Sequence, residues 1–266
     1  MKRLTLTATV FLLLTCAVMA QKKSIELFNG KNLDGWDTYI GAKDENSERY
    51  GLNNDPEKVF SVVTRNGESL LRISGDINGA LATGEEYENY HLKLIFKWGD
   101  KVAKSRNSGL LYHSFGNFGE GLGIWMSSHE LQLWTEHIGD SYCMGNSYFE
   151  IPAVKSADGK SYVYDAKGGM TKFGEGQASK ICSKNLDNEK PVGEWNVVEL
   201  YCFGGTAVHV VNGKVNMINY NSGKLVNGRM LPLAKGKIQL QSEGGELFVR
   251  KMTLTKIDKI PEHLLK

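Results

Sequence analysis

The sequence of 266 residues is 41% apolar and 23% charged, which excludes a disordered, collagen-like or coiled-coil chain. It has 32 basic and 30 acidic residues, and its first twenty residues include two of the bases and no acid. A chain that begins at Gln21 is therefore formally neutral, which gives no electrostatic reason to expect binding to nucleic acid or anionic lipid. Thirty glycines and 10% aromatic residues predict many turns between aromatic-rich strands.

The amino terminus has the features of a secretory signal peptide. Two basic residues precede a mostly apolar run at 4–18, which is shorter than the about 20 residues that a membrane span needs. The small side chain of Ala20 predicts cleavage after this residue. We therefore expect a periplasmic or secreted protein, with a signal peptide at 1–20, one domain at 21–266 and no membrane-spanning segment.

The cysteines bear on export and on cross-linking. A lipoprotein attached through Cys16 is the less favoured alternative, because Thr15 stands where a small Ala or Gly is expected. Cys143, Cys182 and Cys202 remain in the exported chain, and their spacing does not resemble a zinc site. One disulfide with one buried thiol, and three buried thiols, are both compatible with the sequence.

Strands are predicted along most of the remaining chain. Alternating apolar residues predict a strand at 90–98, and Asn66-Gly67 predicts a hairpin between apolar runs. Further hairpins are predicted from the Gly-rich turns that follow. The predicted pairs are 59–63 with 69–73, 195–203 with 207–211 (with a third strand from 214), and 237–241 with 247–254. No stretch of twelve residues has a clear helical periodicity, so the pattern predicts a β-sandwich or barrel.

Two polar stretches interrupt this pattern, at 40–55 and 154–193. Loops of this length are uncommon unless they are functional or disordered. We expect them to form the rim of a binding face, with a short strand at 161–164 and room for an inserted hairpin in the second stretch.

Residues 105–145 contain an unusual row of polar and aromatic side chains. A strand is predicted from Trp125 through Glu136, and alternate residues of a strand share one face. Glu130, Gln132, Trp134 and Glu136 then lie on one face, with the residues between them on the other. An exposed strand can show such a row by chance, but a carbohydrate cleft explains it well, since sugars present an apolar face to aromatics and hydroxyls to carboxylates and amides.

The same row disfavours a standard glycosidase. Retaining enzymes place two carboxylates about 5–5.5 Å apart. Glu130 and Glu136 are separated by roughly 20 Å if the strand is straight, at about 3.3 Å per residue. Gln132 and Trp134 occupy the positions where a glucanase-like strand has acids. A bulge near Thr135 would shorten the separation.

Histidine supplies further chemistry-capable groups. His113 is expected on the neighbouring strand, where it could join Glu130 and Glu136 in a divalent-cation site or a proton-transfer set. His129 is out of register with Glu130 and is interpreted as structural. His209 lies on a hairpin strand and is the next candidate if His113 is not involved.

Seven segments together resemble the 3-keto-disaccharide hydrolase domain family. They occur in family order from about 26 to 257 and cover nearly all of the exported chain. The segments are 26–36 (ELFNGKNLDGW), 106–113 (RNSGLLYH), 130–133 (ELQL), 193–196 (GEWN), 211–213 (VNG), 236–241 (GKIQLQ) and 248–252 (FVRKM).

This resemblance implies an all-β, concanavalin A-like jelly-roll sandwich of two antiparallel sheets. It also implies an exported carbohydrate-active enzyme that acts on sugars oxidised at C3. A C3 ketone acidifies the C2 hydrogen, and expulsion of the glycosidic oxygen from C1 then cleaves the bond. This elimination needs a base, an electrophile on the ketone oxygen and an acid for the leaving group.

The expected site follows from these considerations. The catalytic candidates are His113, Glu130 and Glu136, and a divalent metal ion held by His113 and Glu130 would polarise the ketone. The expected substrate-binding residues are Arg106, Asn107, Gln132, Trp134 and Asp140. The partner is an oligosaccharide or glycoside, and no organic cofactor is expected. A conventional glucanase-like hydrolase and a non-catalytic sugar-binding module are the alternatives.

Overall fold

The computed structural model describes residues 24–266, so the expected signal peptide and Cys16 lie outside the described residues. Within 24–266 all sheet pairings between named strands are antiparallel, and the sole helix is a 3₁₀ turn at Glu262–Leu264. None of the helical structure at 24–266 is long and apolar enough to cross a membrane.

The larger sheet has twelve strands. Its path is β13 (Tyr162–Tyr164), β12 (Ser147–Lys155), β18 (Lys214–Val226), β17 (Thr206–Val211), β16 (Asn196–Phe203), β8 (Tyr90–Val102), β21 (Gly245–Lys256), β5 (Glu68–Ile73) and β4 (Phe60–Arg65). Three more strands attach to this path: β1 (Ser24–Glu26) to β21, β14 (Gly169–Gly174) to β12, and β19 (Arg229–Pro232) to β18.

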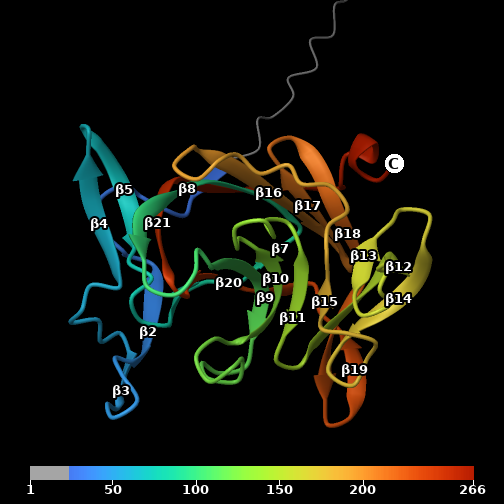
Figure 1. Ribbon diagram of the computed structural model, residues 1–266, viewed down its shortest axis with the longest axis horizontal. Coiled ribbons are helices and arrows are strands. Elements are labelled where there is room, and N and C mark those ends of the chain that lie inside the picture. Colours follow the sequence, from blue (N-terminus) through green and yellow to red (C-terminus); the bar gives the residue numbers. More distant parts are fainter. Residues whose placement is uncertain (1–23) are drawn as a thin grey trace, which may run out of the picture.

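The smaller sheet has nine strands. Its path is β15 (Ile181–Cys182), β11 (Ser141–Met144), β10 (Ser127–Gln132), β9 (Gly109–Phe115), β20 (Lys235–Ser242), β6 (Gly79–Thr83), β2 (Trp36–Ala42) and β3 (Arg49–Leu52), with β7 (Tyr87–Glu88) beside β20. In Figure 1 the arch formed by β8, β16, β17 and β18 covers β9, β10 and β11.

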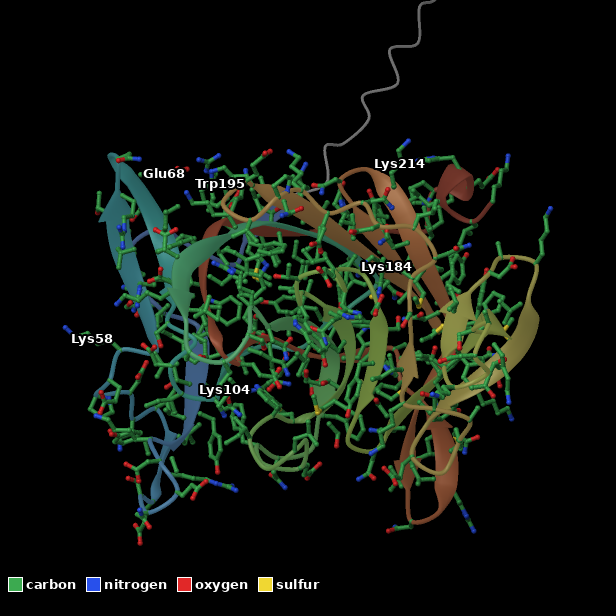
Figure 2. All side chains as sticks on the ribbon, viewed as in Figure 1. Lys58, Glu68, Lys104, Lys184, Trp195 and Lys214 are labelled. Atoms are coloured by element: carbon green, nitrogen blue, oxygen red, sulfur yellow. The ribbon has the colours of Figure 1, made fainter. Side chains whose placement is uncertain are left out.

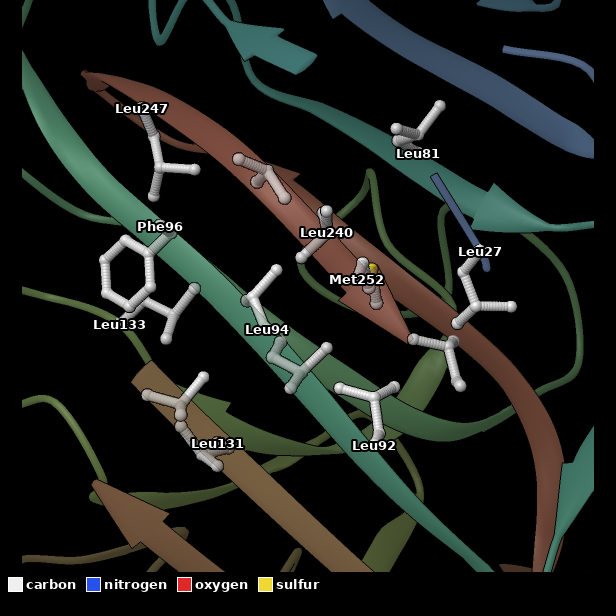
Figure 3. Close-up of a cluster of buried hydrophobic side chains, with 14 of the residues drawn as sticks. Leu27, Leu81, Leu92, Leu94, Phe96, Leu131, Leu133, Leu240, Leu247 and Met252 are labelled. Atoms are coloured by element: carbon white, nitrogen blue, oxygen red, sulfur yellow. The ribbon is translucent and has the colours of Figure 1, made fainter. Parts of the chain in front are cut away.

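The core lies between the sheets and follows from the alternation along β8. Tyr90, Leu92, Leu94, Phe96 and Trp98 are buried, whereas the residues between them are half-buried on the outer face. Leu131 and Leu133 belong to the same buried cluster, in the opposite sheet. Figure 3 shows the β8 leucines and Phe96 in one row, beside Leu247 and Met252 of β21. The predicted alternating strand is therefore confirmed, and the fold is a concanavalin A-like jelly-roll sandwich.

Two of the predicted hairpins are confirmed. Strands β4 and β5 pair around Asn66 and Gly67, whose φ angles of 50° and 77° match a type I′ turn. Strands β16, β17 and β18 form the predicted three-stranded meander.

The predicted hairpin at the carboxyl end is wrong. Strands β20 and β21 follow one another in sequence, but β20 pairs with β9 and β6 while β21 pairs with β8 and β5. The glycines of the connection carry the chain from one sheet to the other. Gly244 has a φ of 112°, and a Cβ on Gly245 would lie 2.8 Å from the Cα of Arg106.

The predicted strand from Trp125 through Glu136 is also too long. Strand β10 ends at Gln132, whose side-chain oxygen accepts hydrogen bonds from the N–H groups of Leu133 and Trp134. The chain then turns back to β11, and Gly139 N–H donates to the Gln132 carbonyl. Positions beyond Gln132 therefore do not continue the alternation of the strand.

The polar stretch at 154–193 forms strands β13, β14 and β15. Both β13 and β14 pair with β12, so the hairpin forms with the strand that begins before this stretch and not within it. Strand β15 extends the smaller sheet, whereas β13 and β14 extend the larger one. The described cysteines, Cys143, Cys182 and Cys202, are three buried free thiols.

Candidate active site

A cleft of about 480 Å³ opens on the face of the smaller sheet that points away from the core. Glu130 of β10 and Gln241 of β20 line it, whereas their neighbours Leu131 and Leu240 belong to the core. The volume lies within the range of about 300–1,000 Å³ typical of small-molecule sites. The alternation along β10 and β20 thus separates the cleft from the core.

The floor of the cleft contains buried polar atoms without a protein partner. Glu130 is 2% exposed and Gln241 is 0% exposed, yet within the described part of the chain Oε1 of Glu130 and both amide atoms of Gln241 make no hydrogen bond. Gly109 of the intervening strand β9 leaves room for them, since a Cβ there would collide with Oε1 of both side chains. Buried polar groups normally have partners, so these atoms are available to a ligand.

Glu243 supplies a second carboxyl group at this floor, directly after β20. Burial raises the pKa of Glu243 to about 7, against a lowering effect of Lys104. Burial also raises the pKa of Glu130 well above its ordinary value, and the charge of Glu243 adds to this shift. Two carboxyl groups with raised pKa values in a cleft are typical of acid–base sites.

Glu243 and Gln241 were not among the residues predicted from the sequence. The same period-two argument that selected Glu130 and Gln132 places Gln241 and Glu243 on one face of the strand that contains Leu240. The alternation therefore indicates these two side chains, whereas the Glu-Gly-Gly-Glu stretch by itself indicates only a turn.

The other predicted binding residues differ in their placement. Asn107, Gln132, Trp134 and Asp140 line the cleft. The buried Oδ1 atom of Asn107 has no partner, whereas Oε1 of Gln132 is used by the backbone after β10. Arg106 is not among the residues that line the cleft; its carbonyl instead accepts a hydrogen bond from Thr135 N–H.

The walls of the cleft are partly apolar. Trp134 is 41% exposed, and Ile181 of β15 and Leu122 of the Gly-rich loop before β10 are 46% and 66% exposed. All three line the cleft. Polar groups on the floor and apolar groups on the walls match the two kinds of surface that a glycoside presents.

A histidine–carboxylate pair lies in the turn between β10 and β11. His137 Nδ1 is 3.0 Å from Asp140 Oδ2, and the His137 ring packs against Trp134 with centroids 4.7 Å apart and ring planes inclined by 32°. Asp140 also accepts a hydrogen bond of 2.7 Å from Lys184 N–H. Burial raises the pKa of Asp140, although these hydrogen bonds oppose the shift. His137 and Asp140 both line the cleft.

His113 does not join this site. It lies on β9 next to β10, as expected, but the pairing of the two strands is irregular there and His113 has a φ of 50°. Its ring is buried between the sheets, with centroids 5.9 Å from Tyr90 and 6.3 Å from His129. Burial lowers the pKa of His113 to about 3. The expected convergence with Glu130 is therefore wrong, because a bulge turns this side chain to the core.

Glu136 also lies apart from the cleft. It has a φ of 71° in the turn after β10, where its N–H donates to the Glu189 carboxylate and its carbonyl accepts from Lys184 Nζ. Glu136 does not line the cleft with Glu130. The expectation that both glutamates face one site fails because the strand ends before Glu136.

The expected metal site of His113 and Glu130 does not fit the structure, because the two side chains lie on opposite faces of the smaller sheet. Within 24–266 there is also no group of three or more His, Cys, Asp and Glu residues that could hold a metal ion.

His129 and His209 are buried, and their ring nitrogens contact other buried side chains of the protein. His129 Nε2 is 2.7 Å from Ser222 Oγ, and His209 Nε2 is 3.1 Å from the Tyr112 hydroxyl. Both pKa values are lowered by burial, that of His209 to about 4. Neither residue lines the cleft.

Solved structures of similar proteins include two from Parabacteroides distasonis described as candidate glycosyl hydrolases. The first is 18% identical and the second 19%, and both have a TM-score of 0.48. Each match covers 88% of this chain, with 94% of the first structure's chain and 100% of the second's. A protein of unknown function with a galectin-like fold from Bacillus subtilis is 10% identical, with a TM-score of 0.46 and coverage of 84% of this chain and 90% of its own. No curated protein matches the chain.

A family model covers most of the sequence. The model of the 3-keto-alpha-glucoside-1,2-lyase-like domain matches residues 23–255. This range contains every residue of the cleft floor and both sheets, except for the last residue of β21. The chain belongs to this 3-keto-disaccharide hydrolase domain family.

Proposed function

We propose that the protein is an exported enzyme that cleaves 3-keto-glycosides by abstraction of the C2 proton and elimination of the C1 oxygen. The observation that carries this proposal is the cleft floor, where Glu130 and Glu243 have raised pKa values beside an unpartnered amide, Gln241. Membership of the family and the row of sugar-compatible side chains support the substrate class.

Glu243 is assigned as the base. A general base works best when its pKa is near the operating pH, and burial raises the pKa of Glu243 to about 7. Its carboxylate takes the proton from C2, and the electron pair of the C–H bond forms an enolate with the C3 ketone. The enolate then re-forms the ketone while the C1–O bond breaks, which leaves a C1–C2 double bond.

Glu130 is assigned as the electrophile. Burial raises its pKa strongly and so favours the protonated carboxyl group, which can donate a hydrogen bond. A protonated carboxyl group in an apolar site can stabilise an oxyanion in this way. Glu130 donates to the C3 oxygen as it gains negative charge, and the Gln241 amide N–H donates to the same region of the sugar.

The test is an assay with a chromogenic 3-keto-glucoside and its unoxidised parent. Cleavage of the keto form alone supports the proposal, cleavage of the parent supports a conventional glycoside hydrolase, and cleavage of neither supports a sugar-binding module. Glu243→Gln and Glu130→Gln should each lower kcat by about 10²–10⁴-fold, which is the usual contribution of an acid–base group.

A matched control comes from the outer edge of the larger sheet. Glu68 of β5 forms an exposed ion pair with Arg250 and does not line the cleft. Figure 2 shows it far from Lys184, which directly follows the cleft residue Ser183. Glu68→Gln should leave kcat unchanged. If Glu243→Gln retains the wild-type rate on the keto substrate, Glu243 is not the base.

A further inference from the structure

The elimination assigned to Glu130 and Glu243 leaves one chemical requirement without a residue. The glycosidic oxygen departs with the electron pair of the C1–O bond, and an alcohol with a high pKa is a poor leaving group unless it is protonated. The cleft floor contributes the base and the electrophile. The acid must therefore come from another part of the same cleft.

The pair of His137 and Asp140 lies in that cleft. Its geometry has the two features of a catalytic imidazole: one ring nitrogen is held by a carboxylate, and the other is free. His137 Nδ1 is 3.0 Å from Asp140 Oδ2, and Nε2 has no hydrogen bond to any group of residues 24–266. A carboxylate in this position fixes the ring orientation and directs the second nitrogen toward a substrate.

The surroundings hold this pair in place. His137 N–H donates to the Trp134 carbonyl at 2.8 Å, and Asp140 N–H donates to the His137 carbonyl at 3.0 Å. Lys184 N–H fixes the second oxygen of Asp140 at 2.7 Å. The His137 side chain is 43% exposed although its partner is buried. The orienting carboxylate is thus rigid, while the imidazole can be reached from the cleft.

Trp134 indicates where a substrate would place its leaving group. The Trp134 ring packs against His137 at a tilt, is 41% exposed and lines the cleft with it. A leaving-group ring that packed on Trp134 would have its linking oxygen near His137 if the oxidised sugar ring lay on the polar floor at Glu130 and Gln241.

We propose that His137, oriented by Asp140, is the general acid that protonates the departing glycosidic oxygen. This inference rests on the proposed function. In the imidazolium form, Nδ1–H donates to Asp140 and Nε2–H gives its proton to the oxygen as the C1–O bond breaks. Before the next turnover Glu243 releases the C2 proton to water and the neutral imidazole regains one from water, so the enzyme neither gains nor loses a proton.

The test uses the dependence of the rate on the leaving group. A 3-keto-glucoside with a 4-nitrophenyl leaving group needs little protonation, whereas one with a methyl leaving group needs it fully. His137→Gln should lower kcat/KM by about 10²–10⁴-fold on the methyl glycoside, the usual contribution of an acid–base group, and by less than about tenfold on the nitrophenyl glycoside. Asp140→Asn should also lower kcat/KM more on the methyl glycoside than on the nitrophenyl glycoside, and each loss should be smaller than in His137→Gln.

His91 provides a matched control. It bonds Glu199 at 2.7 Å and stacks on Tyr201 with centroids 4.1 Å apart, but it lies on the outer face of the larger sheet. His91→Gln should leave both rates unchanged, and circular dichroism should give folded spectra for all variants.

The outcomes separate the two proposals. If the wild-type protein cleaves both keto substrates and His137→Gln loses equal factors on both, or loses nothing, the assignment of His137 is overturned and the proposed function stands. If the wild-type protein cleaves neither keto substrate, the proposed function fails and the assignment fails with it. If His137→Gln loses kcat/KM mainly on the methyl glycoside, which has the poor leaving group, the result supports both the proposed function and the assignment of His137.

Discussion

At the scale of single residues, the site depends on two glutamates that burial affects to different degrees. Glu130 is 2% exposed on β10, between β9 and β11, and burial together with the charge of Glu243 raises its pKa strongly. Glu243 lies at the end of β20 under the influence of Lys104, and its pKa is raised only to about 7. Burial therefore favours the protonated form of Glu130 more strongly than that of Glu243, which makes Glu130 the better proton donor and Glu243 the better acceptor.

The first prediction concerns the pH dependence of turnover. A base must be deprotonated, so kcat/KM on a 3-keto-glucoside should rise with pH through about 7, the pKa of Glu243. Because the charge of Lys104 lowers this pKa, Lys104→Met should move the rising limb to higher pH. Lys101→Met, on the exposed end of β8, should not move it. A limb that stays in place in Lys104→Met would contradict the assignment of Glu243.

The second prediction concerns stability. The folded protein raises the pKa of Glu130, so the native state holds this proton more tightly than the unfolded chain. The stability of the wild type should therefore fall as pH rises above about 4.3, the unfolded value, up to the folded pKa. Glu130→Gln has no such proton to hold, so its stability should not fall in this range. The free energy of unfolding of the variant relative to the wild type should therefore increase by up to about 1.4 kcal/mol per pH unit.

Urea unfolding at about pH 4 and about pH 8 measures this difference. The variant should gain stability relative to the wild type between the two conditions while it loses activity. A variant that is less stable than the wild type at the higher pH would show that the Glu130 carboxylate is well accommodated in the fold.

At the scale of the elements, single strands separate the two faces of each sheet. Strand β8 presents Phe96 and Trp98 to the core and its lysines to the outside, and β10 presents Leu131 to the core and Glu130 to the cleft. A bulge or a strand end changes this assignment at once. His113 of β9 and Glu136 after β10 illustrate the two cases.

The third prediction compares two tryptophans of the larger sheet. Trp98 is 3% exposed in the core, so Trp98→Ala should lower the free energy of unfolding by about 3–5 kcal/mol. Trp195 is half-buried before β16, between Arg250 at 4.0 Å and Lys97 at 5.0 Å from its centroid. Its replacement by Ala should cost about 1–2 kcal/mol. Denaturant unfolding measures both, and a change in Trp98→Ala within experimental error would contradict its burial.

At the scale of the whole molecule, the cleft is assembled from distant parts of the sequence. Glu130 and Asp140 come from the middle of the chain, Ile181 from the inserted strands, and Gln241 and Glu243 from the carboxyl-terminal part. The inserted segment extends both sheets, through β15 on one side and β13 and β14 on the other. One wall of the cleft is thus attached to both layers of the sandwich.

The fourth prediction follows from the balanced charge of the chain, 32 bases against 30 acids before any processing. The protein should therefore neither attract nor repel an uncharged keto-glycoside over long distances. Added salt that shortens the Debye length from about 30 to 3 Å should then change kcat/KM by less than about twofold. Assays from about 0.01 to 1 M salt measure this. A fall of about tenfold would indicate an anionic substrate.

The sequence by itself determined the elements whose cause is local. The alternation at 90–98 predicted β8 and its buried face, because side chains of a strand alternate regardless of what they pack against. Asn66-Gly67 predicted the β4–β5 hairpin, since both residues tolerate a positive φ. The same local rule placed Glu130 and Gln132 on the face that forms the cleft.

Only the tertiary structure decided what depends on partners distant in sequence. Strands β20 and β21 are neighbours in the chain, but pairing with β9 and with β8 assigns them to different sheets. That assignment brings Glu243 beside Glu130, and it is invisible in a local pattern because strand pairing is set by the two partners together. The bulge that turns His113 into the core has the same origin, since it is a mismatch of register between neighbouring strands rather than a property of the residues.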